Sequence, residues 1–308
     1  MALFRKRSVV AEPTDLALTF FSISAANEFR SLAARVFADI GVRVVIHPGH
    51  AVDESGRQFG FWNVAALCAQ QPRDQWRDTL LKYLTTVLER MNAPSPFDGL
   101  DLAEAEYRTY SRLYDAESVP SLENYLHQEF APGIVEMLAL DLPDAVAIFK
   151  HEDARQLGGF AALRSHGVAN LEELPVESFE TLPTPGGGSF YALLGESVYT
   201  ASRALLLPSL ATTLSGDAPN EHGWLMSVPN RHQVVWHVIE DDTVIHAVQA
   251  MTSFTRLGFS DSPGPLSPHV FWWNGSSYEQ LTQIDDEGSV SIHVSPRFQA
   301  VLEAVTAH

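Results

Sequence analysis

The stretch Gly223–His237 carries the residues of this sequence that are best spaced to bind a ligand. Pro229 fixes the backbone angle at the first central position of a turn and Asn230 tolerates the second, so the apolar runs on either side form a hairpin. Arg231 then extends from the hairpin end with a planar fork of N–H donors, which suits carboxylates and other anions. The candidate ligand-binding residues are Asn230, Arg231, His232 and Asp115.

The same arginine has a structural interpretation. Its guanidinium can hydrogen-bond backbone carbonyls or a carboxylate beside the turn, and so tie the turn to a neighbouring loop or to a helix C-terminus. We expect this structural role for Arg231, and a ligand-reading arginine at the rim of a pocket is the alternative.

Three other stretches begin like catalytic motifs, and each lacks a residue that the chemistry requires. Gly186–Ser189 is glycine-rich, but no lysine follows to reach a phosphate. Gly195–Ser197 starts like a nucleophile elbow, but Tyr199 stands where the second glycine must allow a sharp turn. The pair His151-Glu152 has Arg155 where a zinc protease needs its second histidine. We therefore assign no catalytic residue.

The 12 histidines include one set with the composition of a metal site, His47 and His50 with Asp53. A polar turn after a strand has the same composition without any metal. The histidines of the last third have no pair at i, i+4 on a helix or i, i+2 on a strand, the spacings that direct two imidazoles at one ion. Apolar neighbours indicate that Cys68 is a small buried core residue. The sequence therefore predicts no metal and no cofactor.

Charge argues against two classes of partner. Acidic side chains number 38 against 20 basic ones, which gives a formal net charge of −18. Such a surface repels phosphate backbones and anionic lipids, so we expect neither a nucleic-acid nor a membrane partner.

The most apolar segment, Tyr199–Leu214, is interrupted by Arg203 and Pro208 and is too short to span a bilayer. A single cysteine forms no internal disulfide and fits a reducing compartment. We predict a cytoplasmic protein with an unknown protein or small-molecule partner.

Hydrophobic spacing predicts an α+β fold of short, mostly antiparallel strands and hairpins packed with helices, in one or two intimately packed domains. The Pro- and Gly-containing linker Asn92–Asp101 separates a helix–strand–strand–helix unit (1–95) from a larger α+β unit (102–308). Predicted helices cover Ala25–Asp39, a segment from Pro72, Glu152–Leu174 in one or two pieces, Tyr199–Leu214, Thr243–Leu257 and a segment from Pro296. Predicted strands cover Val42–Ile46 and its hairpin partner Arg57–Asn63, Tyr107–Tyr114, Ile134–Leu140, Ala145–Phe149, Phe190–Leu194, Trp224–Val228, Gln233–Ile239, Val270–Trp273, Tyr278–Thr282 and Ser289–Val294.

A longer pattern of apolar and turn residues extends on both sides of the Pro229–Arg231 hairpin. Its members are Asn63-Val64-Ala65-Ala66-Leu67, Arg112-Leu113-Tyr114-Asp115, Leu140-Asp141-Leu142-Pro143, Tyr199-x-x-Ser202, Leu205-Leu206-Leu207, Val228-Pro229-Asn230-Arg231, Pro265-Leu266-Ser267-Pro268 and Val270-Phe271-Trp272. In this order the residues resemble the YtpQ-type family of bacterial proteins, which is classed as a domain of unknown function. The resemblance covers most of Phe59–Thr282 and implies a cytoplasmic α+β protein of unknown role.

Two classes of function fit these observations. The first is a non-catalytic binding or protein-interaction protein, supported by the aromatic residues near the hairpins, such as Trp224, Trp236 and Trp272. The alternative is an unrecognised hydrolase or transferase acting on an anionic small molecule, in which Arg231 orients the anion and Asp115 or a histidine of the last third is the base. Of the two, we expect the binding protein.

Overall fold

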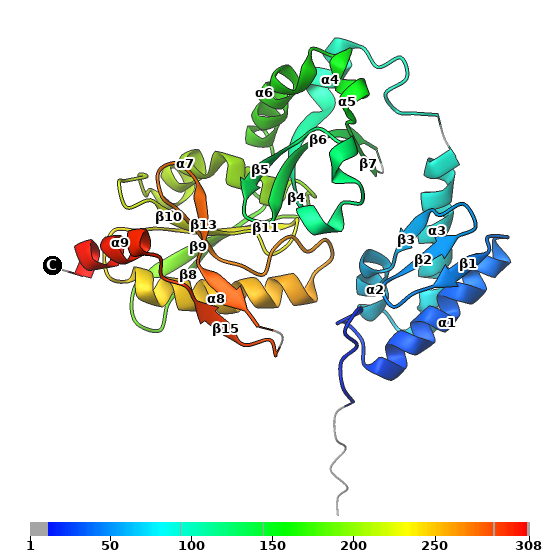
Figure 1. The fold of residues 1–308 in the computed structure, drawn as a ribbon, viewed down its shortest axis with the longest axis horizontal. Helices are drawn as coiled ribbons and strands as arrows, with labels where there is room; N and C mark the ends of the chain where they lie inside the picture. The colour runs from blue at the N-terminus through cyan, green and yellow to red at the C-terminus, as the bar shows by residue number, and fades with distance from the viewer. Residues whose placement is uncertain (1–11, 93, 144, 286, 307–308) are drawn as a thin grey trace, which may run out of the picture. The chain divides into compact units, whose positions relative to one another are not determined.

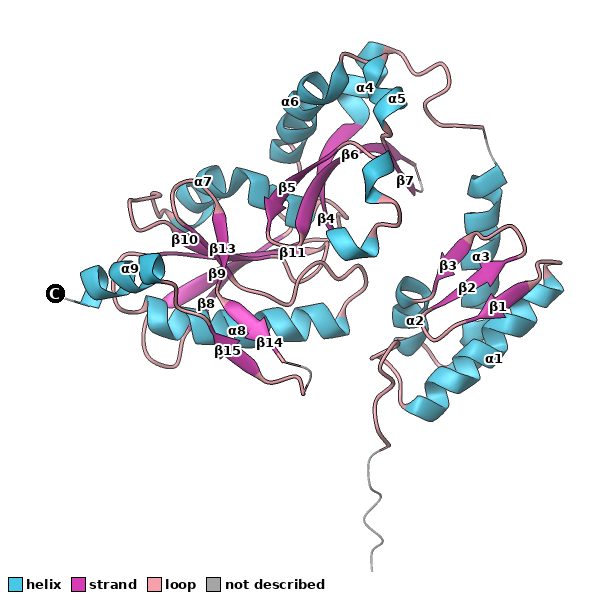
Figure 2. Ribbon diagram, in the orientation of Figure 1, coloured by secondary structure: helices cyan, strands magenta, loops and turns pink. Residues whose placement is uncertain are grey.

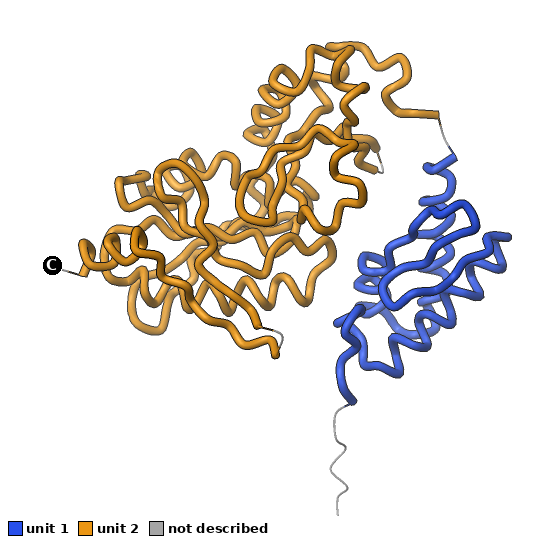
Figure 3. Tube along the Cα trace, viewed as in Figure 1, with its two compact units in different colours: residues 1–93 blue, residues 94–308 orange. Residues whose placement is uncertain are grey.

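The computed structural model describes residues 12–306 apart from 93, 144 and 286, and it confirms the predicted α+β class (Figures 1 and 2). The chain forms two compact units, Met1–Ala93 and Pro94–His308 (Figure 3). Each unit has apolar core residues of its own.

Unit 1 combines helices with a small antiparallel sheet of order β1-β2-β3. Its core is aromatic, and the rings of Phe29 and Phe61 meet edge to face at 5.6 Å. The side-chain oxygen of Ser22 accepts the Ala25 N–H and starts the first helix. The elements are α1 (Ile23–Asp39), β1 (Val44–Ile46), β2 (His50–Asp53), β3 (Gln58–Gly60), α2 (Trp62–Ala69), the 3₁₀ helix η1 (Arg73–Gln75) and α3 (Trp76–Asn92).

The predicted pairing in unit 1 is wrong. β1 pairs with β2, which the sequence did not reveal, and β3 pairs with β2 instead of with β1. The expected turn is present, because the Asp53 carboxylate accepts the N–H groups of Ser55 and Arg57, but this turn joins β2 to β3. The strand predicted to reach Asn63 ends at Gly60, and α2 begins at Trp62. Helix–strand–strand–helix is therefore corrected to three strands between α1 and α2.

The first half of unit 2 is a sheet of order β4-β6-β5, with β7 also on β6. β4 pairs with the length of β6 on one side, while β5 and β7 share the other side. The elements are α4 (Leu102–Arg108), β4 (Thr109–Asp115), η2 (Ala116–Ser118), η3 (Leu122–Asn124), β5 (His127–Ala131), β6 (Ile134–Leu142), β7 (Ala145–Ile148), α5 (His151–Arg155) and α6 (Gly159–Glu172).

The strand predicted for Tyr107–Tyr114 begins two residues later than expected, at Thr109. The preceding residues form α4, because the Asp101 carboxylate accepts the Glu104 N–H at 2.8 Å and caps a helix there. This local cap outweighs the strand preference of Tyr107.

The second half of unit 2 is a six-stranded antiparallel sheet of order β13-β12-β10-β11-β9-β8. The predicted hairpin is confirmed, since β10 and β11 pair from Trp224 with Val238 to Ser227 with Val235. The elements are β8 (Ser178–Pro183), β9 (Ser189–Leu194), η4 (Thr200–Leu206), α7 (Leu207–Leu210), η5 (Ala211–Ser215), β10 (Trp224–Ser227), β11 (Gln233–Val238), α8 (Val244–Asp261), β12 (Phe271–Trp273), β13 (Tyr278–Gln280), the separate pair β14 (Thr282–Ile284) and β15 (Val290–Ile292), and α9 (Pro296–Thr306).

Side chains of the six-stranded sheet alternate between two cores, as the period of two in a strand requires. Met226 and Trp236 pack with residues of η4 and α7 on one face. Leu225 and Val235 pack with residues of α8 on the other (Figure 1). Because both faces of this sheet are buried, the sequences of these strands are nearly continuous runs of apolar residues.

The single helix predicted for Tyr199–Leu214 is wrong. The structure has a 3₁₀ helix (η4), one α-helical turn (α7) and a π-helical turn (η5) in its place. Pro208 lacks an N–H and cannot continue the hydrogen bonding of the preceding turn. The Leu207 N–H donates to the carbonyl of Ala204, three residues earlier in the chain, which is the 3₁₀ pattern.

Replacing Gly167 by alanine tests how closely α6 packs against β4. Helix propensity alone would stabilise the variant by about 1 kcal/mol. An alanine Cβ would however lie 2.6 Å from the Ser111 backbone nitrogen. We therefore expect Gly167→Ala to lower the free energy of unfolding by roughly 1–3 kcal/mol, measured by urea denaturation. The control Ala169→Gly, at an exposed position of α6, should cost about 1 kcal/mol. A Gly167→Ala protein more stable than the parent would contradict this packing.

Candidate functional site

Asn230 holds the predicted turn in place. Its side chain is fully buried, its Nδ2 donates to the Gly258 carbonyl at 2.8 Å, and its Oδ1 accepts the His232 N–H at 2.9 Å. Both ends of the amide are therefore used inside the fold, and Asn230 is a structural residue.

Arg231 and His232 bind each other at the end of the hairpin. The Arg231 Nε donates to the His232 Nε2 at 2.9 Å, so the ring proton is on Nδ1, which donates to the Gly195 carbonyl at 3.1 Å. Burial lowers the pKa of His232, and the charge of Arg231 lowers it further. The stem of Arg231 passes so close to Gly264 that a Cβ there would lie 2.6 Å from the Arg231 Cδ. Both side chains therefore have structural contacts at this turn.

Asp115 caps a separate turn. It lies at the end of β4, where its Oδ1 accepts the Glu117 N–H at 3.1 Å and starts η2. Burial raises the pKa of its carboxyl group. The structure thus brings Asn230, Arg231 and His232 together in one turn and gives the Asp115 carboxylate a capping role of its own.

The histidines of the predicted metal set stack on each other. The rings of His47 and His50 lie 4.6 Å apart at 14°, while Asp53 binds the Arg57 Nε at 2.7 Å. Over the described part of the chain, no three His, Cys, Asp or Glu side chains are grouped to hold a metal ion. Cys68 is buried, as predicted, and burial raises its thiol pKa to about 12.

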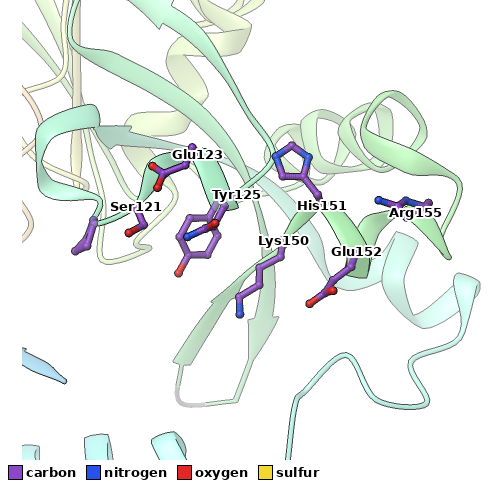
Figure 4. Close-up of a pocket in the computed structure, with 9 residues that line it drawn as sticks. Ser121, Glu123, Tyr125, Lys150, His151, Glu152 and Arg155 are labelled. Atoms are coloured by element: carbon purple, nitrogen blue, oxygen red, sulfur yellow. The ribbon is translucent and has the colours of Figure 1, made fainter. Parts of the chain in front are cut away.

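A depression of about 680 Å³ lies between the segment that precedes β5 and the start of α5. We call it the Lys150 pocket. Figure 4 shows Ser121, Glu123 and Tyr125 on one side of it and the α5 residues on the other. Its lining residues are Pro120, Ser121, Glu123, Asn124, Tyr125, Lys150, His151, Glu152 and Arg155.

Backbone hydrogen bonds set the position of Lys150. A single antiparallel bridge pairs Lys150 with Tyr125, and the preceding Phe149 donates its N–H to the Leu138 carbonyl on β6 at 3.0 Å. The Lys150 N–H donates to the Asp153 Oδ2 at 2.9 Å and starts α5. His151 and Arg155 follow one helical turn apart, so they share one face of α5.

The pocket contains charges of both signs that do not neutralise each other. Within the described residues, neither the Lys150 ammonium nor the Arg155 guanidinium forms an ion pair with a carboxylate. Glu123 and Glu152 line the same space. The arrangement can therefore bind a carboxylate at the cations and a donor group at the acids.

Ser121 adds backbone strain to the pocket. Its φ of 54° and ψ of 48° lie in the left-handed region. Among the described residues, no other non-glycine residue has a positive φ. Such strained residues gather at ligand sites, because the surrounding structure must hold them.

Sequence reasoning missed this pocket. It considered His151, Glu152 and Arg155 only as an incomplete zinc motif and did not consider Ser121–Tyr125. The two segments meet because β5, β6 and β7 pair, and pairing between distant residues leaves no local pattern. The available signal was the pair of basic residues Lys150 and Arg155 at the start of a predicted helix in an acidic chain.

Comparisons with protein-family models, with curated proteins and with solved structures found no match for this chain. None of the described helices is long and apolar enough to cross a lipid bilayer. A function must therefore come from the chemistry of the chain's own residues.

Removing the Arg231 side chain tests its structural role. Arg231→Ala leaves the His232 Nε2 without its donor and removes the stem beside Gly264. We expect a loss of about 1–3 kcal/mol of unfolding free energy, which lowers the thermal midpoint by roughly 2–4 °C per kcal/mol in a domain of this size. Arg256→Ala, at an exposed position, is the control and should leave the midpoint unchanged. Equal midpoints for the two variants would favour the ligand-reading role.

The lowered pKa of His232 predicts acid sensitivity. In the unfolded chain histidine titrates near pH 6.5, above its folded pKa, so the unfolded state takes up the proton first. The stabilisation is present above about pH 6.5 and is lost as the pH falls through the folded pKa. In urea denaturation, His232→Gln should show a smaller loss between neutral and mildly acidic pH than the parent protein. Some loss remains, because burial also lowers the pKa of His237 and His269.

The control for this measurement is the exposed His127. His127→Gln should keep the pH dependence of the parent. If His232→Gln and the parent lose stability in parallel, His232 is not a buried neutral imidazole.

Proposed function

We propose that this chain is a non-catalytic binding protein whose ligand is a small zwitterion, a molecule with one carboxylate and one ammonium group, held in the Lys150 pocket. The observation that carries the proposal is the charge arrangement. Lys150 and Arg155 stay unpaired with carboxylates of the described residues, although Glu123 and Glu152 line the same pocket. The volume, about 680 Å³, suits a small molecule.

The field of the whole protein favours a zwitterion over a simple anion. A chain of net charge −18 repels anions at long range, and this repulsion slows their approach even to a basic pocket. A zwitterion has no net charge, so it avoids most of this long-range repulsion. Its carboxylate can then bind Lys150 or Arg155 while its ammonium faces Glu123 or Glu152.

The alternative, a hydrolase or transferase acting on an anionic small molecule, stays a prediction with less support. It uses Arg231 to orient the anion and Asp115 or a histidine as the base. His232, next to Arg231, has hydrogen-bond partners at both ring nitrogens inside the fold. The Asp115 carboxylate caps η2. A base with free access to a ligand is thus better sought elsewhere, and binding without catalysis is favoured.

Two further parts of the proposal rest on the sequence. The proposed cytoplasmic location rests on the single cysteine, which fits a reducing compartment. The proposed resemblance to the YtpQ-type family rests on the residue pattern around Pro229–Arg231 and does not specify an activity. Both agree with a binding protein, and neither bears on which zwitterion it takes.

Blocked amino acids test the proposal directly. Isothermal titration of the purified protein with each free amino acid should identify at least one that binds. Its N-acetyl and C-amide derivatives each lose one of the two charges and should bind at least about tenfold more weakly, since a charge-assisted hydrogen bond contributes about 1.5–3 kcal/mol.

The variants Lys150→Gln and Arg155→Gln should weaken binding of that amino acid by a similar factor, and Arg256→Gln should not. Both pocket positions are exposed, so the variants should fold like the parent. The proposal is wrong if blocked and free amino acids bind equally, or if no free amino acid binds.

A further inference from the structure

A second pocket, of about 430 Å³, lies where β5 and β6 meet the β12–β13 hairpin. We call it the Glu136 pocket. Its apolar side is aromatic, with Phe130, Trp273 and Tyr278. The charged residues that line it are Glu129, Glu136 and Arg164. β13 packs against β5 at this place (Figure 1).

The aromatic wall is fixed by contacts that do not involve a ligand. Tyr278 lies at the centre, 5.0 Å from the Phe130 ring and 5.1 Å from the Trp273 ring. Its hydroxyl accepts the Trp224 Nε1–H at 3.1 Å, and Trp273 stacks on Trp224 at 5.5 Å. The rings therefore need little rearrangement to receive a ligand, which lowers the entropic cost of binding.

Glu136 is a fully buried carboxylate in a strand whose other residues, apart from Asp141 near its end, are apolar. Its Oε2 accepts the Gln128 Nε2–H at 2.5 Å and the Arg164 Nε–H at 3.1 Å. Its Oε1 lies 2.9 Å from the Arg164 Nε but has no well-aligned donor within the described residues. Burial of a carboxylate with a spare acceptor is costly, and a ligand charge nearby would compensate for it.

The local charge is negative. Glu129 is exposed beside the ion pair of Glu136 and Arg164, and two carboxylates with one guanidinium leave a formal charge of −1 (−2 + 1). Aromatic faces carry a negative quadrupole and attract cations, and a nearby carboxylate adds its own Coulomb attraction. The net charge of −18 draws cations toward the protein from a distance.

We propose that the Glu136 pocket binds the methylated ammonium head of a small organic cation, which lies against the rings of Phe130, Trp273 and Tyr278 next to Glu129 and Glu136. A methylated ammonium presents an apolar shell around its charge, so it loses little hydrogen bonding when it leaves water for an aromatic wall. An unmethylated ammonium would need acceptors for all of its N–H groups, and the Glu136 Oε2 already accepts from Arg164 and Gln128. This site is independent of the Lys150 pocket.

Tetramethylammonium is the probe for this proposal, and tert-butanol, of similar shape without charge, is its control. Saturation-transfer NMR and isothermal titration of the full chain should show binding of tetramethylammonium and much weaker binding of tert-butanol. Raising the salt concentration should weaken the binding of the cation, because part of the attraction is long-range charge. Equal binding of both molecules, or binding of neither, would overturn the proposal.

Two variants locate the site. Phe130→Leu keeps an apolar side chain but removes one ring face, and we expect an affinity loss of about fivefold. Glu129→Gln changes an exposed charge and keeps the shape, with an expected loss of about threefold. Glu123→Gln makes the same charge change in the Lys150 pocket and should leave tetramethylammonium binding unchanged.

Since Phe130 is half-buried, its variant is used only if its thermal midpoint matches that of the parent, and the exposed Glu129 variant decides the test if it does not. If Glu129→Gln and Glu123→Gln weaken binding equally, the attraction comes from the overall field and the proposed site is wrong.

Discussion

Unit 2 depends on the way in which the free edge of β4 is covered. β4 pairs with β6 on one side only, and α6 and η4 bury its other side. A buried backbone group without a partner costs about as much as a lost hydrogen bond. The Ser202 Oγ therefore accepts the Leu113 N–H at 3.0 Å, and the Asn170 Nδ2 donates to the Thr109 carbonyl at 2.7 Å. α6 and η4 thus supply the polar side chains that satisfy the backbone groups at this edge of β4.

The same covering segment also holds the six-stranded sheet. The Ala201 N–H of η4 donates to the Arg231 carbonyl at 3.1 Å. The next residue, Ser202, is the one that accepts the N–H from β4. His232 and Gly195 exchange two further hydrogen bonds beside it. The hairpin end is thus part of the joint between two sheets. The residues with the best spacing for chemistry are therefore part of this framework.

The sequence was informative where structure is decided within a few residues. Pro229 and Asn230 predicted the hairpin because turn geometry is local, and the spacing of Phe29, Val36 and Phe37 predicted α1 for the same reason. It failed where a cap or a distant partner decides. The Asp101 cap formed α4 and moved the start of a predicted strand from Tyr107 to Thr109, and β2 is too short to carry a pattern.

The candidate sites could be predicted least. Lys150 meets Tyr125 only through a bridge between separate segments, and the rings around Tyr278 come from β5 and the β12–β13 hairpin. One signal was available and not used. Glu136 interrupts the apolar run Ile134–Leu140, and a charge in such a run indicates a buried polar group that needs a partner.

Both pockets are attached to β6. Glu136 lines one pocket directly, and two residues further along the strand the Leu138 carbonyl accepts the Phe149 N–H beside Lys150, which lines the other. β6 is held on both sides by neighbouring strands. Two ligands would therefore be bound along one strand that is hydrogen-bonded on both sides, and the distance between them would change little with thermal motion. A single molecule with two suitable head groups and a spacer of matched length would gain avidity from the high effective concentration of its second group.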